Sequence, residues 1–114
     1  LWHLIQRTQE GAIDRCRPGA EWREIHLESA KMIGSGLIEL GLLKGDIDSL
    51  VSSGAVALFY PHGLGHLIGL AVHDSGGYQK SREPSSHPQL RYLRTDRVLE
   101  KGMITSVEPG VYFI

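Results

Sequence analysis

Three histidines, His62, His66 and His73, stand close together near the middle of the chain. Glycines at positions 63, 65 and 69 lie among them and let the backbone turn tightly and approach a bound group. Imidazole binds divalent metals and carries protons near neutral pH, and a site that uses both properties needs several imidazoles together. Each histidine taken alone could be an ordinary buried or surface residue. The cluster predicts a site for metal binding or proton transfer.

The spacing of His62 and His66 raises one specific alternative. Two histidines four residues apart can bind zinc from one face of a helix. Here the residues between them are Gly-Leu-Gly, which disfavour a helix, and the glutamate of a His-Glu-x-x-His motif is absent. The sequence therefore excludes a zinc-binding helix of that kind.

Glu108 lies where a β-prone run, 103–107, meets Pro109. Proline holds the residue before it in an extended conformation, so the direction of the Glu108 side chain is restricted. A carboxylate at a buried strand end costs several kcal/mol unless a cation compensates its charge. A metal ion would supply that charge. The alternative is a glutamate on an edge strand that faces water.

Three arginines recur at intervals of three residues: Arg91, Arg94 and Arg97. This pattern is typical of a solvated charged face. A partly buried guanidinium could instead bind a carboxylate in bidentate fashion. The remaining histidines, at positions 3, 26 and 87, carry no signal that assigns them a role.

The helices expected to position these side chains lie in the first half of the chain. Apolar residues recur at helical spacing in 1–16 and in 22–38, and Pro and Gly at 17–19 separate the two runs. Gly41 is placed to end the second helix in a left-handed conformation. The glycines at 34 and 36 would allow close packing against a sheet. A short helix over 47–53 would be capped by the aspartate at 46 or 48.

The second half of the chain has a different pattern. A loop rich in Ser, Pro and Gly is expected over 75–89, and β-prone runs follow at 103–107 and 111–114. Helices followed by strands, without βαβ alternation, favour an α+β fold. The 114 residues suit one domain or a large part of one.

Composition argues against several classes of function. The formal net charge is −1, so no nucleic-acid groove and no contact with an anionic membrane surface are predicted. No apolar run approaches the roughly 20 residues of a membrane helix, and no signal peptide is recognisable. Cys16 is the single cysteine, which favours a reducing compartment, and the cytoplasm is the predicted location.

Four blocks of residues resemble the pita-bread metallopeptidases, and among these the prolidases. They are Phe59-Tyr60-Pro61-His62-Gly63-Leu64-Gly65-His66, Gly69-Leu70-Ala71-Val72-His73-Asp74, Leu93-Arg94-Thr95 with 99–103, and 105–114. The family also includes aminopeptidase P, methionine aminopeptidase and creatinase. The resemblance implies helices packed on a curved, mainly antiparallel sheet. It also implies that residues 1–114 are part of the C-terminal catalytic domain, cut at both ends.

The resemblance implies a role for each candidate residue. His66 and Glu108 would be metal ligands of a dinuclear site that holds manganese, with cobalt or zinc as substitutes. Glu108 would also carry the proton of the attacking water. His62 and His73 would act in catalysis and orient the substrate, and Arg94 would hold the terminal carboxylate of the substrate.

Three further ligands of the family's site have no counterpart here. Two aspartates precede this region in the family and a glutamate follows it, and Asp14, Asp46 and Asp48 do not match the aspartate motif. The chain alone is therefore predicted to be inactive. The full-length protein is predicted to be a homodimer that hydrolyses Xaa-Pro dipeptides. The alternatives are aminopeptidase P and a metal-free module that binds peptide or protein.

Overall fold

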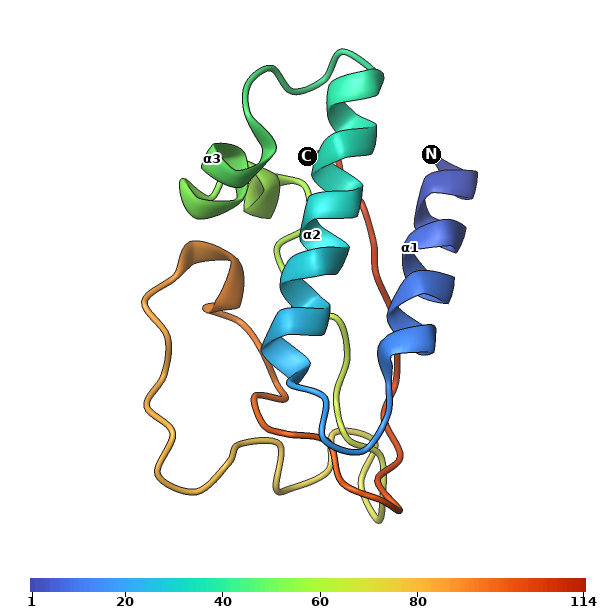
Figure 1. The fold of residues 1–114 in the computed structure, drawn as a ribbon, viewed down its shortest axis with the longest axis vertical. Helices are drawn as coiled ribbons and strands as arrows, with labels where there is room; N and C mark the ends of the chain where they lie inside the picture. Colours follow the sequence, from blue (N-terminus) through green and yellow to red (C-terminus); the bar gives the residue numbers. More distant parts are fainter.

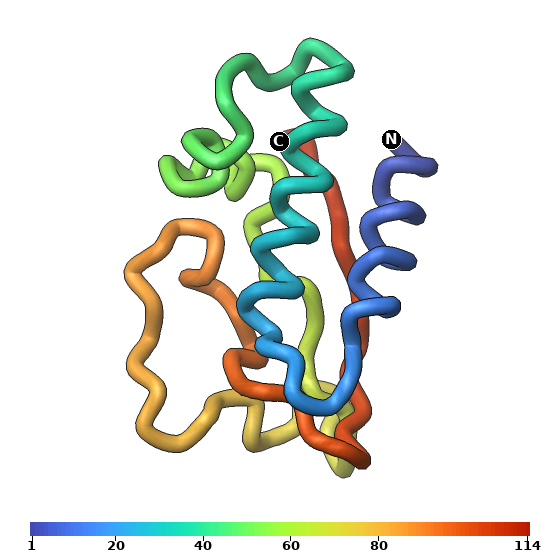
Figure 2. Tube along the Cα trace, viewed as in Figure 1, coloured from blue at the N-terminus to red at the C-terminus, as the bar shows by residue number.

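The computed structural model describes residues 1–114. Its elements are α1 (Trp2–Arg15), α2 (Trp22–Glu39), α3 (Ile47–Ser52) and two short 3₁₀ helices, η1 (Val56–Leu58) and η2 (Pro88–Leu90). Helices α1 and α2 lie side by side and run in opposite directions (Figure 1). The C-terminal segment, red in Figures 1 and 2, passes close to α1, where Gln9 donates a 2.7 Å hydrogen bond to the carbonyl of Val107.

Helix ends follow the sequence signals closely. Gly41 has φ +73°, the left-handed conformation expected after the second helix. The side chain of Asp46 accepts a 3.0 Å hydrogen bond from the Ser49 amide, so Asp46, and not Asp48, caps α3. The predicted helical regions are confirmed within one or two residues.

Glycines in α2 pack against other helices, and the expectation that they face a sheet is wrong. A Cβ at Gly36 would lie 2.4 Å from a methyl carbon of Leu4 in α1. A Cβ at Gly34 would lie 2.5 Å from Ile47 of α3 and 2.9 Å from Val56 of η1. Both glycines therefore allow the helices to approach closely.

Helix α2 contributes to two apolar clusters. The first contains Ala12, Trp22, Ile25, Leu64, Leu90, Leu93 and Leu99. The second contains Ala30, Ile33, Leu37, Val51, Val56 and Tyr60. Because α2 is buried along its length, it anchors the segments that surround positions 64 and 93.

The predicted sheet is not confirmed, because residues 1–114 contain three isolated β-bridges and no strand. Segments 64–68 and 104–108 do pair in antiparallel register. Three backbone amides donate across this pairing: Ile68 to the carbonyl of Ile104 (2.9 Å), Ser106 to that of His66 (2.9 Å) and Glu108 to that of Leu64 (2.7 Å).

Side chains replace the reciprocal bonds of this ladder. The His66 amide donates to the Ser106 hydroxyl at 3.0 Å, and the Leu64 amide donates to Nδ1 of His26 at 3.1 Å. In a regular antiparallel ladder these amides would donate to the carbonyls of Ser106 and Glu108. The pairing is therefore real but irregular, which is why strands do not form.

The predicted long loop is present between positions 75 and 87 and ends at η2. It swings away from the helices and returns beside α2, as its yellow-to-orange path in Figure 2 shows. No helix of the structure is both long and apolar enough to cross a bilayer.

Candidate metal and substrate site

One cavity of about 210 Å³ collects all of the predicted site residues. Its lining residues are His62, Gly63, Gly65, His66, His73, Tyr92, Arg94, Glu108 and Tyr112. The predicted histidines, the arginine and the glutamate come from three separate parts of the chain. The antiparallel pairing of 64–68 with 104–108 brings His66 to Glu108.

His66 and Glu108 face each other in the lining of this cavity. Nε2 of His66 lies 3.0 Å from Oε1 of Glu108. Nδ1 of His66 lies 3.1 Å from the carbonyl of Leu67, and because a carbonyl only accepts, Nδ1 carries the proton in this contact. A neutral imidazole then turns the lone pair of Nε2 toward a carboxylate oxygen. Two such acceptors attract each other only through a cation, either a proton or a metal ion.

Ser106 connects the two side chains and escaped the sequence analysis. Its hydroxyl accepts from the His66 amide and donates to Oε1 of Glu108 at 2.7 Å. The neighbouring Thr105 hydroxyl donates to the carbonyl of His66 at 2.9 Å. A serine or threonine in a β-prone run carries no sign of this role, because the role depends on the register of the pairing.

Gly65 makes this register possible. A Cβ at this position would lie 2.0 Å from the carbonyl oxygen of Ser106, a distance that no side chain could occupy. The glycine therefore lets the chain that carries His66 approach the chain that carries Glu108.

His73 reaches the cavity through a tight return of the chain. The Asp74 amide donates to the carbonyl of Leu67 at 3.0 Å, which brings the segment after Gly69 back toward His66. The rings of His66 and His73 then lie 4.3 Å apart, centroid to centroid, edge to face. The two imidazoles share one wall of the cavity.

His62 has a different set of contacts. Its Nδ1 donates to the carbonyl of Gly63 at 2.8 Å, so Nε2 accepts from the hydroxyl of Tyr112, also at 2.8 Å. Tyr112 lines the cavity and orients His62, a role that the sequence did not indicate. Arg94 also lines the cavity, and its guanidinium has no ion-pair partner in the chain.

The comparisons with known proteins agree over the whole chain. Residues 1–114 match the metallopeptidase family M24 from end to end. The chain belongs to metallopeptidase family M24. Human Xaa-Pro dipeptidase is 39% identical over 114 residues, and the Xaa-Pro dipeptidase of Shewanella frigidimarina is 37% identical over 116. These matches cover 100% and 96% of this chain, but only 23% and 26% of the relatives.

Solved structures of aminopeptidase P share the fold of this M24 chain. The Pseudomonas aeruginosa enzyme PepP superposes with a TM-score of 0.82 at 37% identity. A zinc-substituted Escherichia coli aminopeptidase P in complex with product gives a TM-score of 0.81 at 36% identity. Each match covers 99% of this chain and 23% of the solved chain. The M24 chain thus corresponds to about a quarter of these enzymes.

The donors of the M24 chain fit part of a metal centre. His66 and Glu108 offer one imidazole nitrogen and one carboxylate, a mixed set that suits manganese, cobalt or zinc. No group of three or more His, Cys, Asp or Glu side chains in residues 1–114 could hold a metal ion. These two residues therefore fit two coordination positions, and a complete centre needs ligands from elsewhere.

A buried histidine in α2 holds the backbone next to the site. His26 is fully buried in α2; its Nδ1 accepts from the Leu64 amide, and its Nε2 donates to the carbonyl of Gln89 at 2.7 Å. Burial lowers the pKa of His26 to about 4, so the ring is neutral at pH 7. The sequence assigned His26 no role, yet it joins α2 to the Leu64 backbone, whose carbonyl accepts from the Glu108 amide.

Proposed function

We propose that the whole protein of this chain is a Xaa-Pro dipeptidase that uses two divalent metal ions. The observation that carries the proposal is the 3.0 Å approach of His66 Nε2 to Glu108 Oε1, in a cavity that Arg94 also lines. The names of the similar curated proteins support the substrate class. Because the chain spans 23% of the human relative, activity is proposed for the whole protein.

Two residues of this chain are proposed to bind the metal ions, and one of them also to accept a proton. His66 Nε2 and Glu108 are proposed as ligands of the two ions, Mn²⁺ first and Co²⁺ or Zn²⁺ as substitutes. When bound, such ions supply Lewis acidity to a peptide carbonyl and make a water molecule more acidic. Oε1 of Glu108 is already engaged by Ser106 and His66, so Oε2 remains to accept the proton of the attacking water.

His62, His73 and Arg94 are proposed to act on the substrate. Both imidazoles border the cavity beside the His66–Glu108 pair, where they can orient a peptide and stabilise its developing oxyanion. The unpaired guanidinium of Arg94 suits the terminal carboxylate of a dipeptide, which it can bind through two parallel hydrogen bonds.

Aminopeptidase P is the second candidate, because the solved structures similar to this chain carry that name. The two activities differ in the length of the substrate. A dipeptidase cleaves Gly-Pro faster than Gly-Pro-Ala, and an aminopeptidase of this kind shows the opposite preference. A metal-free binding module would bind such peptides and cleave neither.

Hydrolysis of Gly-Pro tests the assignment. With Mn²⁺ present, the whole protein should release free proline, and His66→Ala should lower kcat/KM by about 100-fold or more, because a ligand of the centre is lost. His3→Ala, on the exposed face of α1, is the matched control and should leave the rate unchanged. Full activity in His66→Ala would show that His66 is not a ligand.

Three finer features are part of the same proposal. The paired segments 64–68 and 104–108 are proposed to belong to a curved antiparallel sheet of the whole protein, with further strands completing the ladder. The whole protein is proposed to be a homodimer. Its location in the cytoplasm stays a prediction from the single cysteine.

A further inference from the structure

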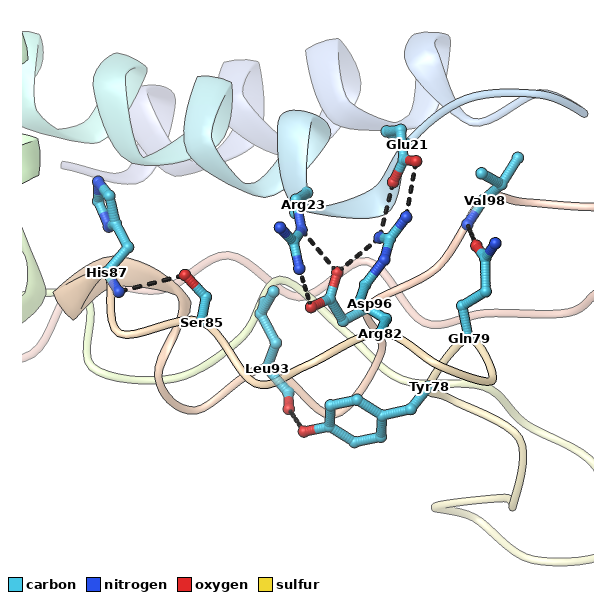
Figure 3. Close-up of polar contacts among 10 residues, drawn as sticks. All are labelled: Glu21, Arg23, Tyr78, Gln79, Arg82, Ser85, His87, Leu93, Asp96 and Val98. Carbon is cyan, nitrogen blue, oxygen red and sulfur yellow. Dashed lines mark hydrogen bonds and ion pairs between the residues drawn. The ribbon is translucent and has the colours of Figure 1, made fainter.

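Four charged side chains form a compact network on the side of α2 (Figure 3). Arg82, from the long loop, forms a bidentate pair with Glu21 through two 2.8 Å contacts. The same guanidinium donates to Oδ1 of Asp96 at 2.9 Å. Arg23 donates to Oδ1 and Oδ2 of Asp96 at 2.8 and 2.5 Å. Arg82 therefore bridges the start of α2 and the segment that contains Asp96.

Asp96 is the buried member of this network, with 3% of its surface exposed. Burial raises the pKa of its carboxyl group, but hydrogen bonds from Arg23 and Arg82 outweigh burial and lower it. The carboxylate therefore stays ionised, and both of its oxygens are occupied. Two acids and two bases balance, so the network holds no net charge.

The network lies next to Arg94, and the backbone between them is held tightly. The Asp96 amide donates to the carbonyl of Gly77 at 2.6 Å, and the Tyr78 hydroxyl donates to the carbonyl of Leu93. A Cβ at Gly77 would lie 2.2 Å from the carbonyl oxygen of Arg94, so the two chains are in contact at this point. The backbone around Arg94 is thus held on both sides, and Arg94 itself lines the cavity without an ion-pair partner.

We propose that Arg82 is a positioning residue that sets the preference for substrates with a free terminal carboxylate. By joining Glu21 to Asp96, it fixes the segment from which Arg94 extends into the cavity. Arg82 and Arg23 also bind both oxygens of the Asp96 carboxylate. Asp96 therefore does not compete with the substrate carboxylate for Arg94. This inference rests on the proposed function, because it requires that Arg94 binds the carboxylate of the substrate.

The test compares Gly-Pro with glycyl-prolinamide, which lacks the terminal charge, using the whole protein with Mn²⁺. Arg82→Met should lower kcat/KM for Gly-Pro about tenfold, mainly through a higher KM, because a displaced Arg94 binds the carboxylate less well. The value for the amide should change less than about twofold. Arg82→Lys keeps the charge but loses the bidentate geometry, and should lie between the wild type and Arg82→Met.

The controls separate this inference from the proposed function. Lys80→Met removes an exposed cation of the same loop and should leave both substrates unaffected. If Arg94→Met removes the preference for Gly-Pro but Arg82→Met does not, the inference is overturned while the proposed function stands. If Arg94→Met also keeps the preference, the role of Arg94 is wrong and the inference falls with it.

A purely structural role for Arg82 predicts a different outcome. Equal losses for the acid and the amide in both Arg82→Met and Arg82→Lys would overturn the inference. If Arg82→Met fails to fold, Glu21→Gln supplies the measurement, because it breaks only the pair with α2 and leaves the Arg82–Asp96 contact. Glu21→Gln should raise KM for Gly-Pro and not for the amide, and the opposite result would reject the proposal.

Discussion

The neutral ring of His26 connects α2 to two backbone segments near the site. Both of its nitrogens are used, because Nδ1 accepts from the Leu64 amide and Nε2 donates to the carbonyl of Gln89. Protonation of Nδ1 would bring two N–H donors face to face and place a charge in the core. The connection from α2 through Leu64 to the Glu108 amide therefore exists only while His26 is neutral.

His26 should make stability depend on pH in a defined window. Its pKa is about 4 in the folded protein and its ordinary value is 6.5, so the unfolded chain binds more protons between these values. Stability should rise with pH from about 4 to 6.5, by up to about 3 kcal/mol, and then level off. Urea unfolding at several pH values measures this dependence. His26→Gln should remove this contribution, and His3→Gln should keep it; an unchanged slope in His26→Gln would contradict this account of the ring.

Ser106 should affect the metal centre without being a ligand. Ser106→Ala removes the hydrogen bond to Oε1 of Glu108 and the acceptor of the His66 amide, so both proposed ligands lose their orientation. The dissociation constant of Mn²⁺ should rise about 10- to 100-fold, as measured by calorimetric titration of the metal-free protein. Ser52→Ala, on the exposed face of α3, is the control. An unchanged constant in Ser106→Ala would show that the ligands are oriented by other contacts.

At the scale of elements, the site depends on how closely two irregular segments approach each other. Local signals were enough to predict the helices and the Gly41 end of α2, and to narrow the cap of α3 to Asp46 or Asp48, because each depends on neighbouring residues. The sheet could not be predicted in this way. The side chains of His26 and Ser106 accept hydrogen bonds from backbone amides 38 and 40 positions away, in place of the carbonyls of a regular sheet. No local sequence pattern indicates such long-range hydrogen bonds.

The same distinction applies to the site. The resemblance to known peptidases predicted site roles for His66, Glu108 and Arg94, and the structure brings these three residues into the lining of one cavity. The supporting hydroxyls of Ser106 and Tyr112, and the charge network of Arg82, were missed. Their roles arise from contacts between segments that are distant in sequence, and such contacts have no periodicity to detect.

Gly65 should tolerate no side chain. Gly65→Ala would place a methyl group 2.0 Å from the carbonyl oxygen of Ser106 and force the paired segments apart. We expect a loss of about 1–3 kcal/mol in the free energy of unfolding, together with weaker metal binding. In the matched control Gly11→Ala, the new methyl would meet Met32 at an ordinary contact distance of 3.5 Å. Because alanine favours a helix over glycine, the free energy of unfolding should rise by about 0.5–1 kcal/mol. Equal stability of the two variants would contradict the close approach at Gly65.

At the scale of the whole molecule, apolar side chains reach solvent on the turn that follows His66. Ile68, Leu70 and Val72 are 41%, 108% and 73% exposed, and the formal net charge is only −1. Exposed apolar groups on a nearly neutral chain favour association.

The 114-residue chain should therefore self-associate. Its apparent mass in light scattering should rise with concentration, and Leu70→Glu should reduce the rise because it adds charge to the exposed turn. Glu83→Lys, on the long loop, serves as a control for a change of charge elsewhere. A constant mass of about 12.6 kDa at all concentrations would contradict the prediction.

Metal content tests most directly whether His66 and Glu108 bind a divalent ion together. The whole protein is loaded with Mn²⁺ and dialysed, and its metal content is measured by inductively coupled plasma mass spectrometry. We expect about two ions per chain in the wild type and in the Glu83→Gln control, and at least one fewer in Glu108→Gln and His66→Ala. Equal metal content in all four proteins, or no bound metal in the wild type, would contradict the assignment.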